Sequence, residues 1–151
     1  MSTVADVMTR GVKTLSPTDT VAQAAQAMAE LNVGSIPVCD GRKLQGIVTD
    51  RDITVRVVAK GLDAQATKLS QIMSADIQWT EEGRDLDEAL REMASRQIRR
   101  LPVVDAAKHL VGIVSLGDIA TKGADDEAAV GESLGEISEP AKPQAAVQTA
   151  R

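Results

Sequence analysis

Apolar residues recur along residues 1–123 at spacings that predict two helices and three strands in each half of this region. One helix of each half carries an apolar stripe, formed by Val21, Ala24, Ala25, Met28 and Leu31 in the first half and by Leu86, Ala89, Leu90 and Met93 in the second. Short apolar runs predict strands at 12–15, 36–39 and 44–48, and again at 77–80, 101–104 and 110–114. A second helix, over 50–60 and 116–122, follows the last strand of each half and precedes a glycine.

The two halves repeat one another at an offset of 65 residues, which becomes 66 after one extra residue near His109. Pro37-Val38 matches Pro102-Val103, and Gly46-Ile47-Val48-Thr49 matches Gly112-Ile113-Val114-Ser115. Polar residues precede each stripe helix, and we expect the segment 16–19 to cap the first helix and Asp85 to cap the second. The sequence therefore predicts an α/β fold of two β-α-β-β-α repeats, packed with pseudo-twofold symmetry and with related clefts between them.

The predicted boundaries place the first repeat at 1–65 and the second at 66–123, with 62–70 as the joint. Residues 124–151 are rich in Ala, Glu, Pro and Gln and hold six acids against two bases. This composition predicts a flexible acidic tail, with a short helix over 126–136 as the alternative. Most of the formal net charge of −5 therefore belongs to the tail, because residues 1–123 hold sixteen acids and fifteen bases.

Composition excludes several classes of function. The chain has one Trp and no Phe or Tyr, so it lacks the stacked rings that single-stranded nucleic-acid platforms need. The net negative charge also opposes nucleic-acid binding. With one Cys and one His, the sequence offers no disulfide, no zinc motif and no nucleophile–base pair for an enzyme. No apolar run approaches the ~18 residues of a membrane span, and the first residues carry no secretory pattern, so we expect a cytoplasmic protein without membrane partners.

One motif, G-h-h-[ST]-x-x-D, occurs where the last strand of each repeat meets its second helix. It places Thr49 three residues before Asp52, and Ser115 three residues before Asp118. A hydroxyl at a helix N-terminus suits a phosphate, and a carboxylate beside it can accept both hydroxyls of a ribose. The same spacing is also a capping box, which serves stability alone. Both interpretations stay open from the residues themselves.

The duplicated unit, with I-P-V or L-P-V followed by G-I-V-[TS]-x-x-D-I, resembles a pair of CBS domains, the Bateman module. The resemblance covers about residues 4–123 and is strongest to small stand-alone bacterial two-CBS proteins. The second repeat is also similar to the last repeat of the AMP-activated kinase gamma subunit.

The resemblance implies a role for each matching position. The two Asp residues would hold the ribose diol, and Thr49 and Ser115 would lie near the phosphate. The adenine would be lined by Thr14 and Trp79 on the first strands and by the segments around the prolines, Ser35-Ile36-Pro37 and Arg100-Leu101-Pro102. Arg99, Arg100 and Arg51 are the phosphate candidates. Trp79 stands where the first repeat has a small residue, Thr14, so it is expected to report on ligand binding in the second cleft or to fill that cleft.

The sequence therefore supports a non-enzymatic sensor that binds AMP, ADP, ATP or another adenosyl ligand such as S-adenosylmethionine or NAD(H). The family also implies a homodimer and an effector protein that this chain does not encode. The alternative is a structural or interaction dimer with degenerate clefts. Cys39 is expected to be buried, His109 to be solvated, and Arg96 to extend the phosphate grip of Arg99 and Arg100.

Overall fold

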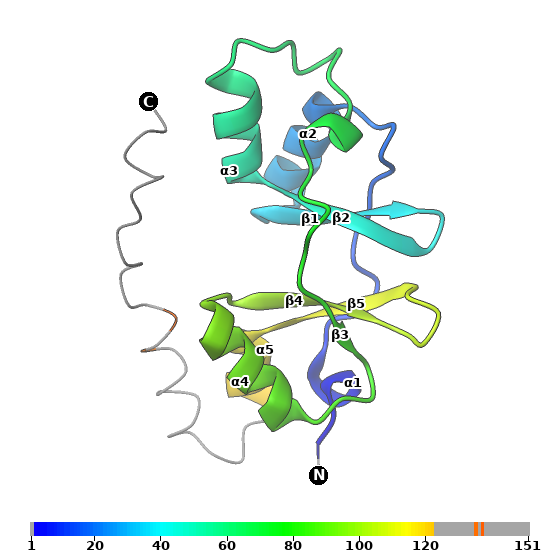
Figure 1. Cartoon of the computed structure of the whole chain (residues 1–151), viewed down its shortest axis with the longest axis vertical. Coiled ribbons are helices and arrows are strands. Elements are labelled where there is room, and N and C mark those ends of the chain that lie inside the picture. Colours follow the sequence, from blue (N-terminus) through cyan, green and yellow to red (C-terminus); the bar gives the residue numbers. More distant parts are fainter. Residues whose placement is uncertain (1, 123–134, 136, 138–151) are drawn as a thin grey trace.

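The computed structural model describes residues 2–122, 135 and 137, and shows two α/β repeats stacked with their sheets facing each other and their helices outside (Figure 1). In the first repeat, helix α2 (Val21–Leu31) precedes strands β1 (Ser35–Asp40) and β2 (Lys43–Thr49), helix α3 (Asp50–Ile53) and a π-helical turn η1 (Thr54–Val58). The second repeat has strand β3 (Thr80–Glu81), helix α4 (Leu86–Arg96), strands β4 (Arg100–Val104) and β5 (Leu110–Ser115), and helix α5 (Leu116–Lys122). Two short helices, α1 (Val4–Val7) and the 3-10 helix η2 (Leu69–Gln71), lead into the repeats. The tail predicted at 124–151 lies outside the described residues except for Gly135 and Ile137.

The paired strands confirm the predicted hairpins. β1 pairs with β2 and β4 pairs with β5, both antiparallel and each with a bulge before its last pairs. The first strands are shorter than predicted. Only Leu15 bridges to Val38 in the first repeat, and only Thr80–Glu81 pairs with β4 in the second. The backbone just before each first strand pairs with the opposite repeat instead, since Thr9 bridges to Ile113 and Ser74 bridges to Ile47.

Capping of the stripe helices follows the prediction at α4 but not at α2. Asp85 accepts the backbone N–H of Asp87 at 2.8 Å, as expected. Helix α2 is instead capped by Thr20, whose hydroxyl accepts the Gln23 N–H at 3.2 Å while the Gln23 side chain accepts the Thr20 N–H at 2.7 Å. The predicted cap at 16–19 was wrong because Asp19 closes its own turn, accepting the Ser16 N–H at 2.8 Å.

The two cores exchange their leading segments across the boundary proposed at residue 65. Val4, Val7 and Met8 are buried in the core of the second repeat. Leu69 and Ile72 are buried in the core of the first. Each leading segment therefore packs in the core of one repeat before the chain continues into the other repeat. This exchange links the two repeats through the backbone and through buried apolar surface.

A third cluster joins the two hairpins. Cys39, Leu44 and Val104 are buried together, and backbone bonds run from Leu110 N–H to the Arg42 carbonyl at 2.8 Å and from Leu44 N–H to the Lys108 carbonyl at 3.2 Å. The predicted burial of Cys39 is confirmed at 4% exposure, and burial raises the pKa of its thiol.

Next to this cluster, His109 is partly exposed, with its Nδ1 3.3 Å from Asp105 Oδ2. The hydrogen bond from the His109 backbone N–H lowers the pKa of Asp105. No helix among the described residues is long and apolar enough to cross a membrane.

Thr80 carries an unpaired hydroxyl in the core. The residue is 1% exposed, and among the described residues its Oγ1 is the buried side-chain polar atom without a hydrogen-bond partner. Thr80→Val replaces this oxygen by a methyl group of the same shape, so the free energy of unfolding should rise by about 1 kcal/mol or more. Denaturant unfolding measures this change.

Thr67→Val is the matched control for this prediction. Thr67 is 8% exposed, but its hydroxyl donates to the Asp63 carbonyl at 2.7 Å. Its replacement should therefore lower the free energy of unfolding by about 1 kcal/mol. An equal loss of stability in both variants would show that the Thr80 hydroxyl is satisfied in the folded protein.

Candidate functional site

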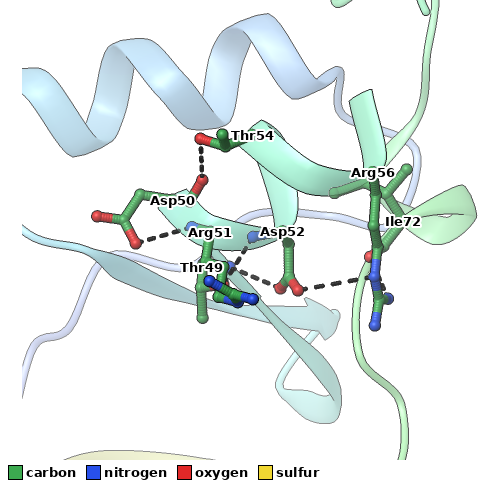
Figure 2. Close-up of polar contacts among 7 residues, drawn as sticks. All are labelled: Thr49, Asp50, Arg51, Asp52, Thr54, Arg56 and Ile72. Carbon is green, nitrogen blue, oxygen red and sulfur yellow. Dashed lines mark hydrogen bonds and ion pairs between the residues drawn. The ribbon is translucent and has the colours of Figure 1, made fainter. Parts of the chain in front are cut away.

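Both copies of the G-h-h-[ST]-x-x-D motif form capping boxes. In the first, Thr49 N–H donates to Asp52 Oδ2 at 2.9 Å and Asp52 N–H donates to Thr49 Oγ1 at 3.0 Å (Figure 2). In the second, Ser115 N–H donates to Asp118 Oδ2 and Asp118 N–H donates to Ser115 Oγ, both at 3.0 Å. The local capping role of the motif is therefore real in both repeats.

Capping uses one carboxylate oxygen of each Asp and leaves the other, Oδ1, facing a basic side chain one turn later. Asp118 Oδ1 lies 3.4 Å from Lys122 Nζ. Asp52 Oδ1 lies 3.8 Å from Arg56 Nε. The Asp side chains are only 18% and 13% exposed, respectively. A carboxylate held in this way can cap a helix and still accept hydrogen bonds from a ligand at Oδ1.

Each motif needs a glycine at its first position because another backbone segment passes too close for a Cβ atom. A Cβ at Gly112 would lie 2.6 Å from the Thr9 carbonyl oxygen, and a Cβ at Gly46 would lie 2.6 Å from that of Ser74. These close approaches let Thr9 exchange backbone bonds with Ile113 at 2.8 and 3.0 Å. The crossing segment is thereby placed beside the second repeat's motif.

A cavity of about 570 Å³ lies beside Asp118 and is lined by both repeats and by the N-terminal segment. The residues that line it are Thr9, Gly11, Val12, Lys13, Leu31, Val33, Ser35, Ile36, Arg100, Ile113, Ser115 and Asp118. We call this space the Asp118 cavity. Lys13 and Arg100 outnumber the single acid in its lining, so its charge favours an anionic ligand.

Five of the predicted site residues meet in the Asp118 cavity: Ser35, Ile36, Arg100, Ser115 and Asp118. Thr49 and Asp52 belong to the matching motif of the first repeat. Arg51 and Arg99 are exposed, and the Arg99 carbonyl accepts the Leu116 N–H at 2.8 Å. Arg96 lies 3.5 Å from Glu92 through its Nε.

The remaining predicted residues lie elsewhere. Pro37, Leu101 and Pro102 are buried strand residues, and Leu101 belongs to the second core. Thr14 is not among the described residues that line the Asp118 cavity. Trp79 is 38% exposed, lines a separate depression with Thr80, Glu81, Gly83 and Arg84, and has Lys108 Nζ 5.9 Å from its ring centre.

The sequence missed the residues that enter the cavity from the N-terminal segment and from the end of α2. Lys13 and Val12 line the cavity where Thr14 was expected, and Leu31 was assigned to the core stripe although it is 49% exposed. One signal could have pointed to Lys13: it belongs to the segment 9–13, which matches residues 74–78 of the second repeat at the offset of 65. Within the described part of the chain, no group of three or more His, Cys, Asp or Glu residues could hold a metal ion.

Comparison with known proteins agrees with the duplicated architecture. The CBS domain family matches residues 4–59 and 69–125. The CBS domain-containing protein YhcV of Bacillus subtilis is 46% identical over 138 residues, which cover 91% of this chain and 96% of YhcV.

Two solved structures share the fold. Hypoxic Response Protein I, solved with two coordinated zinc ions, has a TM-score of 0.72 and 36% identity, covering 79% of this chain and 97% of that chain. CBSX2, solved in complex with AMP, has a TM-score of 0.70 and 27% identity, covering 80% of this chain and 94% of that chain. The protein therefore belongs to the CBS domain family and carries two copies of the domain.

Proposed function

We propose that this protein is a non-enzymatic regulatory module that binds an adenine nucleotide, or another adenosyl ligand, in the Asp118 cavity. The observation that carries the proposal is the meeting of Asp118 and Ser115 from one repeat with Ser35 and Ile36 from the other around one space of about 570 Å³. That volume lies within the range of roughly 300–1,000 Å³ that is usual for small-molecule sites.

Each part of an adenosine phosphate has a suitable partner in this lining. Asp118 Oδ1 can accept hydrogen bonds from a ribose diol, and Lys13 and Arg100 can neutralise a phosphate. Val12, Val33, Ile36 and Ile113 offer aliphatic surface for the base. The positive charges favour a phosphorylated ligand over S-adenosylmethionine, whose sulfonium is itself positive. The complex of CBSX2 with AMP supports this choice of ligand class.

Binding can act as a signal because the cavity joins the repeats. A ligand that contacts both the N-terminal segment and the second repeat stabilises the arrangement in which these parts meet. An effector protein that contacts one arrangement better than the other would then respond to the ligand.

Isothermal titration calorimetry with AMP, ADP, ATP, S-adenosylmethionine and NADH, and with GMP as the guanine control, tests the proposal. We expect saturable binding of at least one adenine nucleotide and weaker binding of S-adenosylmethionine and GMP. The absence of binding by every adenosyl ligand would overturn the proposed function.

An interaction dimer is the second candidate, and exposed apolar side chains favour it. Val55 and Val58 on the π-helical turn η1 are 44% and 69% exposed, and Leu62, in the loop that follows, is 46% exposed. A second copy of the chain that covers this region would bury them. Light scattering at micromolar concentration measures the mass. A dimer that forms with no adenosyl ligand bound at any concentration would favour this candidate over the sensor.

A further inference from the structure

The two motifs differ in the basic residue that faces the free oxygen of their Asp. Arg56 follows Asp52 by four residues, and Lys122 follows Asp118 by four. We propose that Arg56 makes the two positions unequal. In this proposal Arg56 is a positioning residue that fastens Asp52 into a structural joint, so the protein takes one nucleotide, at Asp118. This proposal rests on the proposed function for its ligand.

Arg56 contacts two parts of the first repeat at once. Its Nη1 donates to the Ile72 carbonyl at 2.8 Å, while its Nε lies 3.8 Å from Asp52 Oδ1 (Figure 2). Ile72 is 3% exposed and lies in the first core. Two residues later, Ser74 exchanges backbone bonds with Ile47 at 3.0 Å in both directions. Arg56 therefore links helix, core and crossing segment beside the Asp52 carboxylate.

Lys122 has a different set of contacts. Its Nζ lies 3.4 Å from Asp118 Oδ1, and its side chain is about as exposed as that of Arg56, at 50% against 45%, but this ion pair is the one interaction that the described residues give it. An exposed lysine–carboxylate pair contributes little stability and is easily rearranged. An incoming ribose can therefore take over Asp118 Oδ1 while the ammonium turns into solvent.

Displacement of the basic side chain by a ribose is unfavourable at Asp52. If a ribose displaced the guanidinium, the partly buried bond from Arg56 to the Ile72 carbonyl would be lost with the ion pair. A buried carbonyl without a partner is costly, and arginine is preferred at such sites because its planar group serves two acceptors at once. The difference between Arg and Lys at one position thus decides which Asp remains open to a ligand.

A reciprocal exchange tests the inference. Calorimetry with AMP measures the number of sites and the affinity in the wild-type chain, in Arg56→Lys and in Lys122→Arg. We expect one AMP per chain for the wild type and two for Arg56→Lys, with the affinity at Asp118 changed by no more than about twofold because distant sites act independently. Lys122→Arg should weaken binding at Asp118 by roughly tenfold, because a guanidinium can pair with the carboxylate through two N–H groups and is harder for a ribose to displace than an ammonium.

Three results would contradict this inference. Two AMP per wild-type chain would show that Arg56 leaves Asp52 open. One AMP per chain in Arg56→Lys would show that Arg56 does not decide the stoichiometry. If Arg56→Lys fails to fold, unchanged affinity in Lys122→Arg would show that an arginine at this position does not keep a ligand from the Asp. Far-UV circular dichroism checks the folding of each variant. Absence of AMP binding by every variant is a different result, since it overturns the proposed function and this inference with it.

Discussion

Asp118→Asn should weaken the binding of AMP by roughly 10- to 100-fold while the chain stays folded. The amide oxygen of Asn can still accept the Ser115 N–H that Asp118 Oδ2 accepts at 3.0 Å, so most of the capping box survives. The negative charge is lost, and the amide NH₂ group replaces the oxygen that would accept the ribose hydroxyls. A hydrogen bond to a charged group contributes about 1.5–3 kcal/mol, which corresponds to this loss of affinity. Calorimetry measures the affinity, and denaturant unfolding measures the stability.

Asp6→Asn is the matched control for Asp118→Asn. Asp6 also closes a T-x-x-D capping box, accepting the Thr3 N–H at 2.8 Å, but it does not line the Asp118 cavity. The affinity for AMP should therefore stay within about twofold of the wild-type value, because Asp6 shares no hydrogen-bond partner with Asp118. If Asp118→Asn and Asp6→Asn lose similar stability and neither loses affinity, the motif serves capping alone.

Gly112→Ala should lower both the stability of the chain and its affinity for AMP. The added Cβ would lie 2.6 Å from the Thr9 carbonyl oxygen and 3.0 Å from the Met8 sulfur. Neither neighbour moves freely, because Thr9 is bonded to Ile113 and Met8 is buried in the second core. Such overpacking costs about 1–3 kcal/mol, which lowers the melting temperature by roughly 2–4 °C for each kcal/mol in a chain of this size. Binding of AMP should also weaken, because Thr9 lines the Asp118 cavity.

Two further alanine variants separate packing from ligand binding. Gly46→Ala introduces the same clash, 2.6 Å from the Ser74 carbonyl oxygen, but away from the Asp118 cavity, so stability should fall while AMP binding survives. Gly83→Ala meets no heavy atom within 4 Å and should leave the melting temperature unchanged. A Gly112→Ala protein as stable as Gly83→Ala would show that the crossing segment can move aside.

Local chemistry explains which elements could be predicted. The hairpins, the stripe helices and the second helix of each repeat depend on apolar periodicity and on nearby turn residues, so the duplicated pattern was enough to place them. The first strands and the cap of α2 were predicted less well. The pattern predicts a strand at 12–15, but Thr9, just ahead of it, pairs with the other repeat and only Leu15 bridges to Val38. At the start of α2, Thr20 competes with Ser16 and Asp19 for the same local role.

The candidate site likewise contains some residues that the sequence predicted and others that only the structure revealed. Asp118, Ser115, Ser35, Ile36 and Arg100 were identified from the motifs and the family resemblance, and they share one cavity. Lys13 was not identified, since its role depends on where the N-terminal segment crosses the second repeat. Trp79 was predicted at the second cleft rather than at Asp118, and it lines a depression separate from the Asp118 cavity, with Lys108 Nζ 5.9 Å from its ring centre.

The sequence by itself determined the two repeats, their order of elements and the paired [ST]-x-x-D capping boxes, because these depend on short-range periodicity and on contacts three or four residues apart. Only the tertiary structure decided which residues surround each Asp. The leading segments exchange between the cores, so Lys13 comes to line the cavity at Asp118 and the Ile72 carbonyl comes to Arg56 beside Asp52. Two motifs that are nearly identical in sequence are therefore placed in different surroundings, since long-range packing brings each of them a different partner.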